Sequence, residues 1–363
     1  MIIKSLKLKN FRNYDFLSLK LNAETNVFIG DNAQGKTNIL EALYLSGTTK
    51  SHKGNKDKEV IQFHHEEAHI ETVILKNDVP FTIDMHLKKN KPKGIAINKI
   101  PIKKARELFG IVHFIFFSPE DLNIIKNGPM ERRRFMDIEL AQLDKLYLHT
   151  LSNYNRVLHQ RNRLLRELHI SDDARETLDI WDIQLVEYGI KTIRKRKQFI
   201  EQINEIISAI HLNLSGGIEE LKLHYEPNIE ENQLEKKILS NREKDLRFKN
   251  TTGGPHKDDI CFTVNGIDIR KYGSQGQQRS VALSLKLAEI EIVKQIINDV
   301  PILLLDDVLS ELDVHRQNYL LKSIHNIQTL ITCTGINDFI EHNFLIHKLF
   351  YVNQGKIVKE KEM

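Results

Sequence analysis

The first residues of the chain show the period-two pattern of β-strands. Residues 2–9 and 16–21 alternate apolar with polar side chains, and the polar segment 10–15 joins them. Residues 26–29 form a short, mainly apolar run, which is typical of a strand buried on both faces. These patterns predict an antiparallel pair of strands flanking a parallel sheet.

Further strands are predicted on both sides of a long helical region. Period-two segments lie at 69–75, 81–87 and 95–102, the last as a hairpin. Continuous apolar runs at 111–117 and 330–334 are typical of buried parallel strands. The chain is therefore expected to combine antiparallel and parallel pairing.

Three other segments of the first third have different patterns. The apolar residues of 37–45 fall at helical spacing. Residues 48–58 are polar and basic and contain a glycine, so we expect an exposed loop. A helix with an acidic first turn is predicted to begin at 120–122.

From about residue 129 to 245 a helical pattern dominates. Apolar residues recur at alternating spacings of three and four, which predicts two helices broken at 170–173. We expect an antiparallel helical hairpin whose second helix, at ~1.5 Å per residue, spans roughly 50–60 Å as a protruding arm. The apolar stripe fails at 194–197, where four successive cations form either a solvated surface or a patch that contacts phosphate.

Strand patterns return after the arm. Residues 221–225 and 261–264 flank a helix predicted near 230–247, and Asn265-Gly266 is a strong hairpin signal. The polar loop 252–259 has a sequence too unusual for a simple connection.

Composition narrows the class of protein without identifying it. The 363 residues leave room for two or three domains, and 28% charged with 40% hydrophobic residues is ordinary for a globular protein. A formal net charge of +4 is too small to indicate nucleic-acid binding by itself. Two cysteines without metal or redox spacing suit a reducing compartment. The chain enters a strand pattern at once and has no long apolar run, so we expect a soluble, cytoplasmic protein without signal peptide or membrane partner.

The segment between the strand at 26–29 and the helix at 37–45 fits the phosphate-binding pattern G-x-x-x-x-G-K-[ST]. Backbone N–H groups and the positive helix end would hold phosphate oxygens, Lys36 would reach the β- and γ-phosphates, and Thr37 would ligate Mg²⁺. The nucleotide-binding residues predicted here are Gly30, Asp31, Asn32, Ala33, Gln34, Gly35, Lys36 and Thr37. Arg12, at the end of a strand that enters this region, is a further candidate for phosphate contact or else a solvated loop residue.

The last third carries the complementary half of such a site. A glycine-bearing loop at 272–280 precedes an amphipathic helix and forms a second candidate anion site. Residues 300–305 then form an apolar strand that ends in Asp306 and Asp307. A buried strand has no structural use for two adjacent acids, so we assign one to metal coordination and the other to orienting an attacking water.

These motifs in this order resemble the ABC-type ATPases of the SMC, Rad50 and RecF group. The short helical insertion, together with the blocks at 117–122, 132–137 and 254–259, is similar to the RecF family of bacterial recombination mediators over essentially the whole chain. The resemblance implies an α/β fold, with an ABC-type P-loop ATPase head of mixed sheet and flanking helices and an inserted helical arm with a short antiparallel coiled coil. The expected domains are the N-terminal half of the head at 1–128, the arm at 129–247 and the C-terminal half at 248–363.

The resemblance also implies roles for single residues. ATP and Mg²⁺ would be the ligands, with Asp306 and Thr37 on the metal and Lys36 and Asp307 in catalysis. Signature-motif residues, which would close over ATP held by a second copy in an ATP-dependent homodimer, are Ser274, Gly276, Gln277 and, across the same interface, Asp313.

Departures from the wider ABC pattern predict a weak ATPase that serves as a switch. Asp307 replaces the usual glutamate, and an acid misplaced by about 1 Å can cost ~10²-fold in rate. No histidine follows the last strand, where Thr332 begins the sequence Thr-Cys-Thr, so the γ-phosphate sensor is unidentified. Glu120 or Asp121 would substitute for a missing glutamine.

What the resemblance implies for biology is DNA replication and repair, including the response to DNA damage (SOS response). The dimer would bind DNA at gaps or duplex–single-strand junctions, and this DNA would stimulate its ATPase. It would also help RecO and RecR to load RecA. Candidate DNA contacts, for which solvated loops are the plainer interpretation, are Lys53, Lys56, Lys88, Lys89, Lys91 and Lys93.

Three other classes of protein fit the sequence less well. The nucleotide-binding subunit of an ABC transporter is the main alternative, but the arm and the absence of the switch histidine count against it. An ATPase coupled to a nuclease would need a further catalytic domain. A purely structural coiled-coil protein would leave both phosphate loops and the paired acids unexplained.

Overall fold

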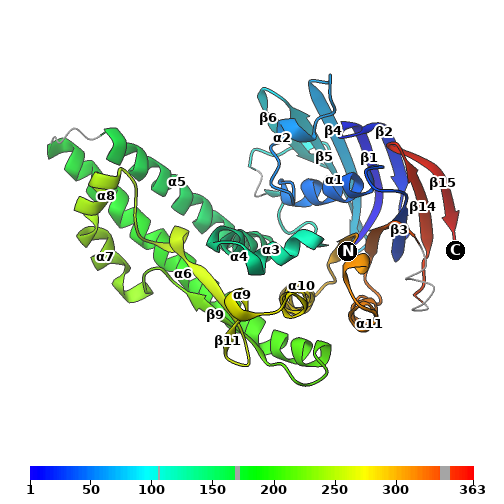
Figure 1. Cartoon of the computed structure of the whole chain (residues 1–363). Coiled ribbons are helices and arrows are strands. Elements are labelled where there is room, and N and C mark those ends of the chain that lie inside the picture. The colour runs from blue at the N-terminus through cyan, green and yellow to red at the C-terminus, as the bar shows by residue number, and fades with distance from the viewer. Residues whose placement is uncertain (105–106, 168–171, 336–343) are drawn as a thin grey trace. The chain divides into compact units, whose positions relative to one another are not determined.

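The computed structural model describes residues 1–104, 107–167, 172–335 and 344–363 (Figure 1). The chain forms two compact units, residues 1–121 with 289–363 and residues 122–288. The second unit therefore extends beyond the predicted arm at 129–247. One reason is that the strand at 259–264, which we had placed in the head, pairs with a strand of the arm region at 221–226.

A six-stranded mixed sheet organises the first unit, in the order β15-β14-β3-β13-β12-β8. All neighbouring pairs are parallel except β14 with β15. The strands are β3 (Thr25–Ile29), β8 (Phe114–Phe117), β12 (Ile302–Asp306), β13 (Thr329–Cys333), β14 (Lys348–Asn353) and β15 (Lys356–Glu362). The predicted parallel strands are confirmed, although β8 is shorter than 111–117 because its partner β12 begins only at Ile302. The strands β14 and β15 were not predicted from the sequence.

An antiparallel sheet with the order β2-β1-β4-β5-β6-β7 forms the other layer of this unit. Its strands are β1 (Ile2–Phe11), β2 (Tyr14–Lys20), β4 (Glu67–Lys76), β5 (Val79–Lys88), β6 (Lys91–Ile97) and β7 (Ile100–Pro101). A predicted strand overlaps each of them, because one buried face gives each longer strand a clear apolar–polar alternation. However, β6 begins at Lys91, in the lysine run interpreted as a solvated loop, and not at residue 95.

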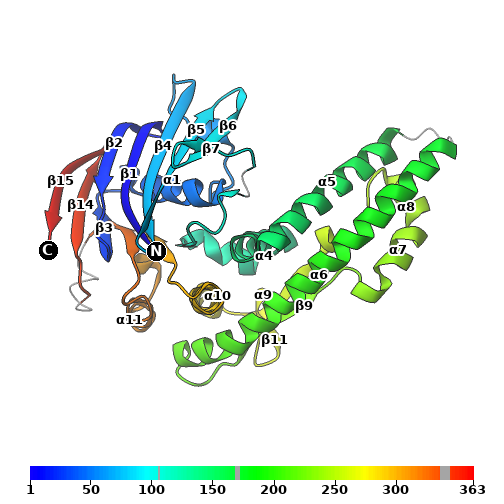
Figure 2. The same cartoon turned by 180° about the vertical axis from the view of Figure 1, so that it is seen from behind.

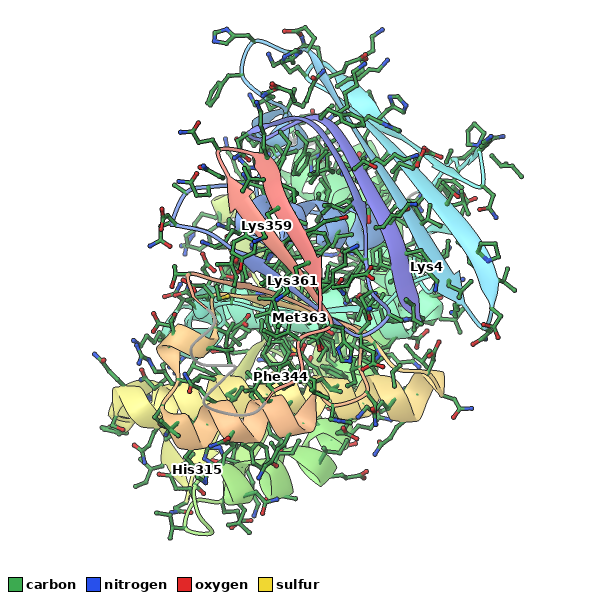
Figure 3. All side chains as sticks on the ribbon, turned by 90° about the vertical axis from the view of Figure 1, so that its right-hand side faces the viewer. Lys4, His315, Phe344, Lys359, Lys361 and Met363 are labelled. Atoms are coloured by element: carbon green, nitrogen blue, oxygen red, sulfur yellow. The ribbon has the colours of Figure 1, made fainter. Side chains whose placement is uncertain are left out.

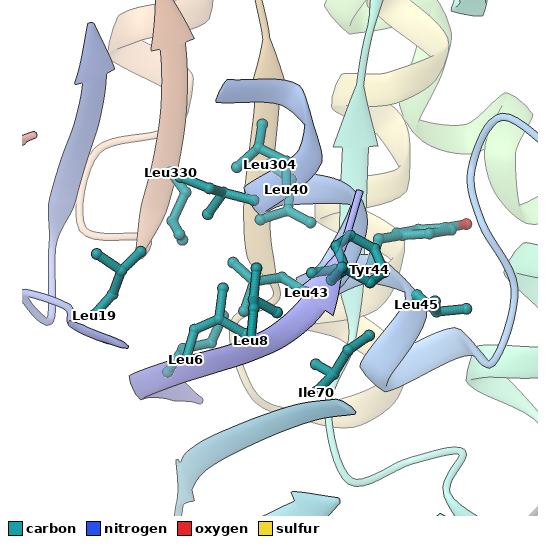
Figure 4. Close-up of a cluster of buried hydrophobic side chains, with 14 of the residues drawn as sticks. Leu6, Leu8, Leu19, Leu40, Leu43, Tyr44, Leu45, Ile70, Leu304 and Leu330 are labelled. Carbon is teal, nitrogen blue, oxygen red and sulfur yellow. The ribbon is translucent and has the colours of Figure 1, made fainter. Parts of the chain in front are cut away.

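Helix α1 (Lys36–Thr48) lies in the core of this unit and is buried along nearly its whole length. Leu40 and Leu43 of α1 join Leu8 of β1, Leu304 of β12 and Leu330 of β13 in one cluster (Figure 4). Burial on nearly all sides means that other elements surround α1, and its buried polar side chains Glu41, Ser46 and Thr48 are hydrogen-bonded. The start of α1, which follows the predicted phosphate loop, is thereby fixed to both sheets.

The edge strand β15 is mostly exposed and alternates lysine with glutamate. Lys359 and Lys361 extend from its surface (Figure 3). Charged side chains on an edge strand disfavour pairing with strands of other molecules. This polar composition also explains why β15 has no apolar pattern that would predict a strand.

The remaining helices of the first unit are short. They are α2 (Asp57–Val60), α11 (Val314–Ser323) and the second part of α10 (Gln275–Ile297), with 3₁₀ turns at Pro119–Asp121 and Leu309–Glu311. The predicted exposed loop at 48–58 was partly wrong, because Thr48, Thr49 and Ser51 are buried. The Ser51 hydroxyl donates to the buried carboxylate of Glu41 at 2.5 Å and draws the chain inward.

A pair of long antiparallel helices forms the second unit, α5 (Lys145–Glu167) and α6 (Asp172–Leu214), which run side by side in both views (Figures 1 and 2). Of the predicted break at 170–173, residues 170 and 171 lie outside the described residues, and Asp172 and Asp173 begin α6 and so are helical. The unit also contains the helices α3 (Leu122–Lys126), α4 (Pro129–Leu143), α7 (Leu234–Ser240), α8 (Arg242–Phe248) and α9 (Ile269–Tyr272), 3₁₀ turns at Glu231–Gln233 and Pro255–Lys257, and a small sheet of β9 (Leu221–Glu226), β10 (Asp259–Val264) and β11 (Ile267–Asp268).

The four cations at 194–197 form only in part the solvated surface that was one of the two predictions, since Arg194 and Lys197 are exposed but Arg196 is not. Arg196 is only 2% exposed and donates to Asp137 at 2.8 Å and Asp258 at 3.0 Å. Burial by itself would lower the pKa of Arg196, but Tyr147, Asp137 and Asp258 raise it. Both expected roles were wrong for this residue: it is a buried cation that joins α6 to α4 and to the loop before β10.

Candidate functional site

The predicted phosphate loop lies between the end of β3 and the start of α1, at the carboxyl edge of the parallel sheet. At two positions of this loop only glycine fits, because a side chain would clash with neighbouring atoms or strain the backbone. A Cβ on Gly30 would lie 2.2 Å from the carbonyl oxygen of Val352, and Gly35 has a φ of +110° with the Asn13 side chain where a Cβ would be. Other residues would force this backbone to move.

Two hairpins hold the outside of this loop. The Tyr14 hydroxyl donates to the Gly35 carbonyl at 3.1 Å, and the Asn13 amide donates to the Gln34 carbonyl at 3.0 Å. From the β14–β15 turn, the N–H of Gly355 donates to the same carbonyl at 3.0 Å, and that of Gln354 donates to Gln34 Oε1 at 2.7 Å. The sequence analysis missed these contacts because they come from distant segments without a motif of their own.

The Lys36 ammonium group lies over the loop. Its Nζ donates to the carbonyls of Gly30 at 2.6 Å and Asp31 at 2.9 Å, so the side chain folds back across the segment that would surround a phosphate. Lys36 is buried although it is charged. A buried ammonium of this kind is suited to meet the negative charge of a phosphoryl group.

The two predicted metal ligands meet at this edge. The Thr37 hydroxyl donates to Asp306 Oδ1 at 2.7 Å, and the Thr332 hydroxyl donates to the same oxygen at 2.8 Å. Burial raises the pKa of Asp306, while these hydrogen bonds and the charge of Lys53 lower it and Glu120 raises it further. A buried carboxylate next to a hydroxyl is a suitable oxygen set for Mg²⁺, which binds through one or two protein oxygens together with phosphates.

The acids at 120 and 121 have different surroundings. The Asp121 carboxylate accepts the N–H of Ser118 at 2.7 Å and so closes a turn. Glu120 is exposed, and its charge acts on Asp306. Of the two predicted substitutes for the missing glutamine, Glu120 is therefore the one whose charge acts on Asp306, and a role for either acid stays a prediction.

Asp307 has a left-handed backbone conformation with φ 53°, which is uncommon for a residue other than glycine. Its N–H donates to the Thr332 hydroxyl at 3.0 Å. Thr332 thus holds both acids of the pair, a role that no motif indicated. The role of Asp307 in hydrolysis stays a prediction.

Arg12, predicted to contact phosphate, is engaged by the protein itself. Its guanidinium group donates twice to Glu41 at 2.8 Å and once to the Glu59 carbonyl at 2.9 Å. Burial opposes ionisation of Glu41, but hydrogen bonds from Arg12 and Ser51 outweigh it and lower the pKa of Glu41. Three of the five guanidinium N–H groups of Arg12 make these hydrogen bonds, so two remain that could contact a phosphate. A phosphate contact by Arg12 stays a prediction.

The predicted signature residues form the first turn of α10. The Ser274 hydroxyl accepts the Gln277 N–H at 3.2 Å, and Gln277 Oε1 accepts the Ser274 N–H at 2.9 Å, which is a capping box. Gly276 is exposed beside them, with the Ser274 hydroxyl 3.9 Å from the position of a Cβ. Asp313 caps α11 by accepting the N–H of Arg316 at 3.0 Å and also pairs with its guanidinium group. Contacts of these residues with a nucleotide remain predictions.

The lysines predicted to contact DNA fall into two groups. Lys88, Lys89 and Lys93 pair with acids of the same chain, namely Glu67, Glu66 and Asp57. Lys53, Lys56 and Lys91 are exposed and make none of the described ion pairs. The second group therefore offers more positive charge to an outside partner than the first.

Comparison with known proteins shows the broad class to which this chain belongs. The sequence model of the family described as RecF/RecN/SMC N terminal domain matches residues 2–357. An Smc head bound to the C-winged helix domain of ScpA aligns with a TM-score of 0.59 at 15% identity, covering 100% of this chain and 98% of that one. The fold is that of an ABC-type P-loop ATPase head of the SMC, Rad50 and RecF group.

Proteins with higher sequence identity to this chain show the particular family within that class. The chain is 61% identical over 357 residues to the DNA replication and repair protein RecF of Agathobacter rectalis, covering 98% of this chain and 99% of that protein. It is 58% identical to RecF of Lachnospira eligens, covering 99% and 100%. A solved structure of the recombination mediator protein RecF with ATP, in the RecFOR pathway, aligns with a TM-score of 0.92 at 32% identity, covering 100% of this chain and 97% of that one. The chain belongs to the RecF family.

Within the described residues, helices long and apolar enough to cross a membrane are absent.

Proposed function

We propose that this chain is an ATP-dependent DNA-repair protein that binds ATP with Mg²⁺ and forms a homodimer when ATP is bound. The observation that carries the proposal is the 2.7 Å hydrogen bond between Thr37 and Asp306. It joins the end of the phosphate loop to the acid at the end of β12, where a metal-bound triphosphate would be expected.

The comparisons support ATP as the nucleotide. Two solved RecF structures, 34% and 32% identical to this chain, are described as complexes with ATPrS and with ATP in the RecFOR pathway. In this chain Thr37 and Asp306 would hold Mg²⁺, which would offset negative charge on the phosphate oxygens. Lys36 would bind the β- and γ-phosphates.

ATP would act mainly by joining two copies. Ser274, Gly276 and Gln277 of one copy would face the γ-phosphate bound to the other, with Asp313 at the same interface. Moving a population from mostly open to mostly closed needs a preference of ~5.5 kcal/mol. Four or more charge-assisted hydrogen bonds of ~1.5–3 kcal/mol each can supply that preference.

Hydrolysis would be slow and would end the closed state. Asp307 would orient the attacking water, but its side chain is shorter than glutamate by one methylene group. The left-handed backbone fixes the start of this short side chain. The dimer would thus persist long enough to mark a site on DNA.

The partner that fits best is DNA at gaps or duplex–single-strand junctions. Lys53, Lys56 and Lys91 are exposed cations suited to backbone phosphates. With RecO and RecR the closed dimer would help to load RecA on single-stranded DNA in the bacterial cytoplasm. The RecFOR pathway of the solved relatives supports this assignment.

Sedimentation velocity tests the proposal directly. The wild type is expected to be monomeric without nucleotide and dimeric with Mg²⁺ and a slowly hydrolysed ATP analogue, with a further shift on gapped DNA. Lys36→Ala should abolish nucleotide binding, whereas Ser274→Arg should retain it and fail to dimerise. A wild type that stays monomeric with saturating analogue, or a Ser274→Arg variant that dimerises, would contradict the assignment.

A further inference from the structure

A chain of hydrogen bonds, buried at His211 and partly buried at Glu219, links the end of α6 to the first turn of α10. His211, near the C-terminus of α6, is 0% exposed. Its Nδ1 lies 2.9 Å from the Ser284 hydroxyl on α10, and its Nε2 lies 3.1 Å from Glu219 Oε2. All of these residues lie in the second compact unit. Both ring nitrogens are therefore engaged, which fixes the orientation of the imidazole.

Glu219 continues the chain to the signature turn. Its Oε1 accepts a hydrogen bond from Gln277 Nε2 at 2.9 Å, while Oε2 faces His211. Gln277 is thus held at both ends of its amide, because its Oε1 accepts the Ser274 N–H. If the Gln277 amide were flipped, its NH₂ group would face the Ser274 N–H and its oxygen would face the Glu219 carboxylate, so both hydrogen bonds would be lost. Only one orientation of Gln277 satisfies all partners.

The position of Glu219 in the chain is itself constrained. Glu219 lies in the turn between α6 and β9, after Gly216 and Gly217 with φ of 70° and 87°. Its N–H donates to the Ser215 hydroxyl at 3.2 Å, and the next N–H, of Glu220, donates to Asn265 Oδ1 at 2.9 Å. The carboxylate is therefore presented by a fixed turn at the base of the long helix.

We propose that Glu219, itself held by His211, is a positioning residue that sets the Gln277 side chain for contact with the second copy and so couples the base of α6 to ATP-dependent dimerisation. The inference rests on the proposed function, because it assumes that the signature turn meets nucleotide across a dimer interface. Glu219 does not touch the nucleotide in this scheme. Its effect should appear in closure of the dimer and not in binding of ATP to the separate protomer.

A purely structural role for Glu219 makes a different prediction. The capping contacts of α10 between Ser274 and Gln277 use the backbone N–H groups of both residues and do not involve Glu219. Removing the Glu219 carboxylate should therefore leave the helix start formed, while it releases the outer end of the Gln277 amide and leaves His211 Nε2 without this partner. The small loss of stability at His211 and the large loss of dimerisation can be distinguished by their size.

The experiment compares three variants of the full chain. Glu219→Ala removes both hydrogen bonds. Glu219→Gln can keep them, since its oxygen can accept from Gln277 and its NH₂ can donate to His211 Nε2 if the ring carries its proton on Nδ1 and donates to Ser284. Glu220→Ala is the matched control, because this neighbouring exposed acid pairs only with Lys222 among the described ion pairs.

Three quantities are measured for each variant: the thermal midpoint, the affinity of the dilute protomer for a fluorescent ATP analogue with Mg²⁺, and the dimer dissociation constant with saturating slowly hydrolysed analogue. For Glu219→Ala we expect the ATP affinity to match wild type and the thermal midpoint to fall by a few degrees, because the buried His211 Nε2 loses its partner. The dimer constant should rise about tenfold for each of the two symmetric sites, on the order of a hundredfold in all. Glu219→Gln should recover most of this loss, and Glu220→Ala should behave as wild type.

The outcomes distinguish the inference from the function on which it rests. If wild type and Glu220→Ala do not dimerise with the analogue, the proposed function fails and the inference falls with it. If they dimerise and Glu219→Ala does so equally well, the positioning role alone is wrong. Equal losses of thermal midpoint and dimerisation in both Glu219 variants would also overturn it in favour of a structural role.

Discussion

Asp306 places a negative charge where it is unfavourable for the free protein. It is 6% exposed, and burial raises its pKa above the ordinary value. An acid whose pKa is higher in the folded than in the unfolded state favours the folded state while it is protonated, at low pH. This stabilisation of the fold is lost as the pH rises through the folded-state pKa. At neutral pH the ionised carboxylate therefore reduces stability, which a cation bound beside it would restore.

Asp306→Asn should accordingly stabilise the nucleotide-free protein while impairing its function. The amide oxygen can still accept from Thr37 and Thr332, but the buried charge is gone. We expect a thermal midpoint a few degrees higher at pH 7.5, a difference that shrinks toward the acid range, and Mg²⁺-dependent ATP affinity reduced by about tenfold or more. Thermal melts with and without Mg-ATP measure both effects.

The exposed turn residue Asp78 supplies the control for this variant. Asp78→Asn should leave the midpoint and the ATP affinity unchanged. A lower midpoint for Asp306→Asn at neutral pH would show that the charged form is favourable in the free protein and would refute the argument from burial.

Arg196 and Arg194 provide a matched pair two residues apart on α6. Arg196 is buried against Asp137 and Asp258, whereas Arg194 is exposed and pairs with Glu231. Arg196→Met leaves buried carboxylates without their cation, so we expect a loss of about 3–5 kcal/mol in the free energy of unfolding. Arg194→Met should change it little, because water screens an exposed ion pair. Urea denaturation measures both; equal losses would mean that burial of the pair does not determine its contribution.

At the scale of elements, the phosphate loop depends on hairpins that lie far from it in sequence. The turn between β14 and β15 donates two N–H groups to Gln34, and Gly355 there has a φ of +71°. A Cβ on Gly355 would lie 2.2 Å from the Asn13 carbonyl oxygen, which belongs to the β1–β2 turn. The loop is thus held between two turns that contact each other.

Gly355→Ala should weaken ATP binding without unfolding the protein. The new methyl group must push the β14–β15 turn away from Asn13 and with it the hydrogen bonds to Gln34. Gly266→Ala is the control, because Gly266 has a similar φ of +80° with open space around its Cβ position. Both should lose about 1 kcal/mol of stability from left-handed strain, but only Gly355→Ala should reduce ATP affinity in calorimetric titration. Equal ATP affinities in the two variants would mean that the turn does not support the loop.

At the scale of the whole molecule, the chain consists of two compact units that share α10. The phosphate loop and the paired acids belong to the first unit, and the signature turn belongs to the second. In the proposed dimer each nucleotide would contact the first unit of one copy and the second unit of the other. DNA binding is then a property of the closed pair, and its electrostatic part can be measured separately.

The lysines differ in how much they should contribute to DNA binding. The affinity of the ATP-bound dimer for duplex DNA should fall with salt, with a slope near −0.9 per phosphate contacted. Lys53→Ala with Lys56→Ala should reduce the magnitude of that slope by about 1–2 per protomer. Lys88→Ala with Lys89→Ala should change it less, because both ammonium groups already pair with glutamates. Fluorescence anisotropy at several salt concentrations tests this order, and a flat salt response of the wild type would remove the electrostatic account.

The sequence by itself determined the strands with one buried face, the two long helices, the phosphate loop and the paired acids. Each of these has a local signature: alternation, helical spacing, or residue types at fixed positions. The strand β15 had no such signature, because an exposed edge strand needs charges in place of apolar residues.

Only the tertiary structure decided which distant residues meet. Lysine and arginine runs look alike in a sequence, yet Arg196 is buried and Lys53 is exposed, since burial depends on acids supplied by other elements. The same holds for Thr332 beside both acids and for Glu219 beside Gln277. Motifs specify the residues that would contact the nucleotide, whereas the side chains that hold them in place are specified by packing, which has no fixed spacing along the chain.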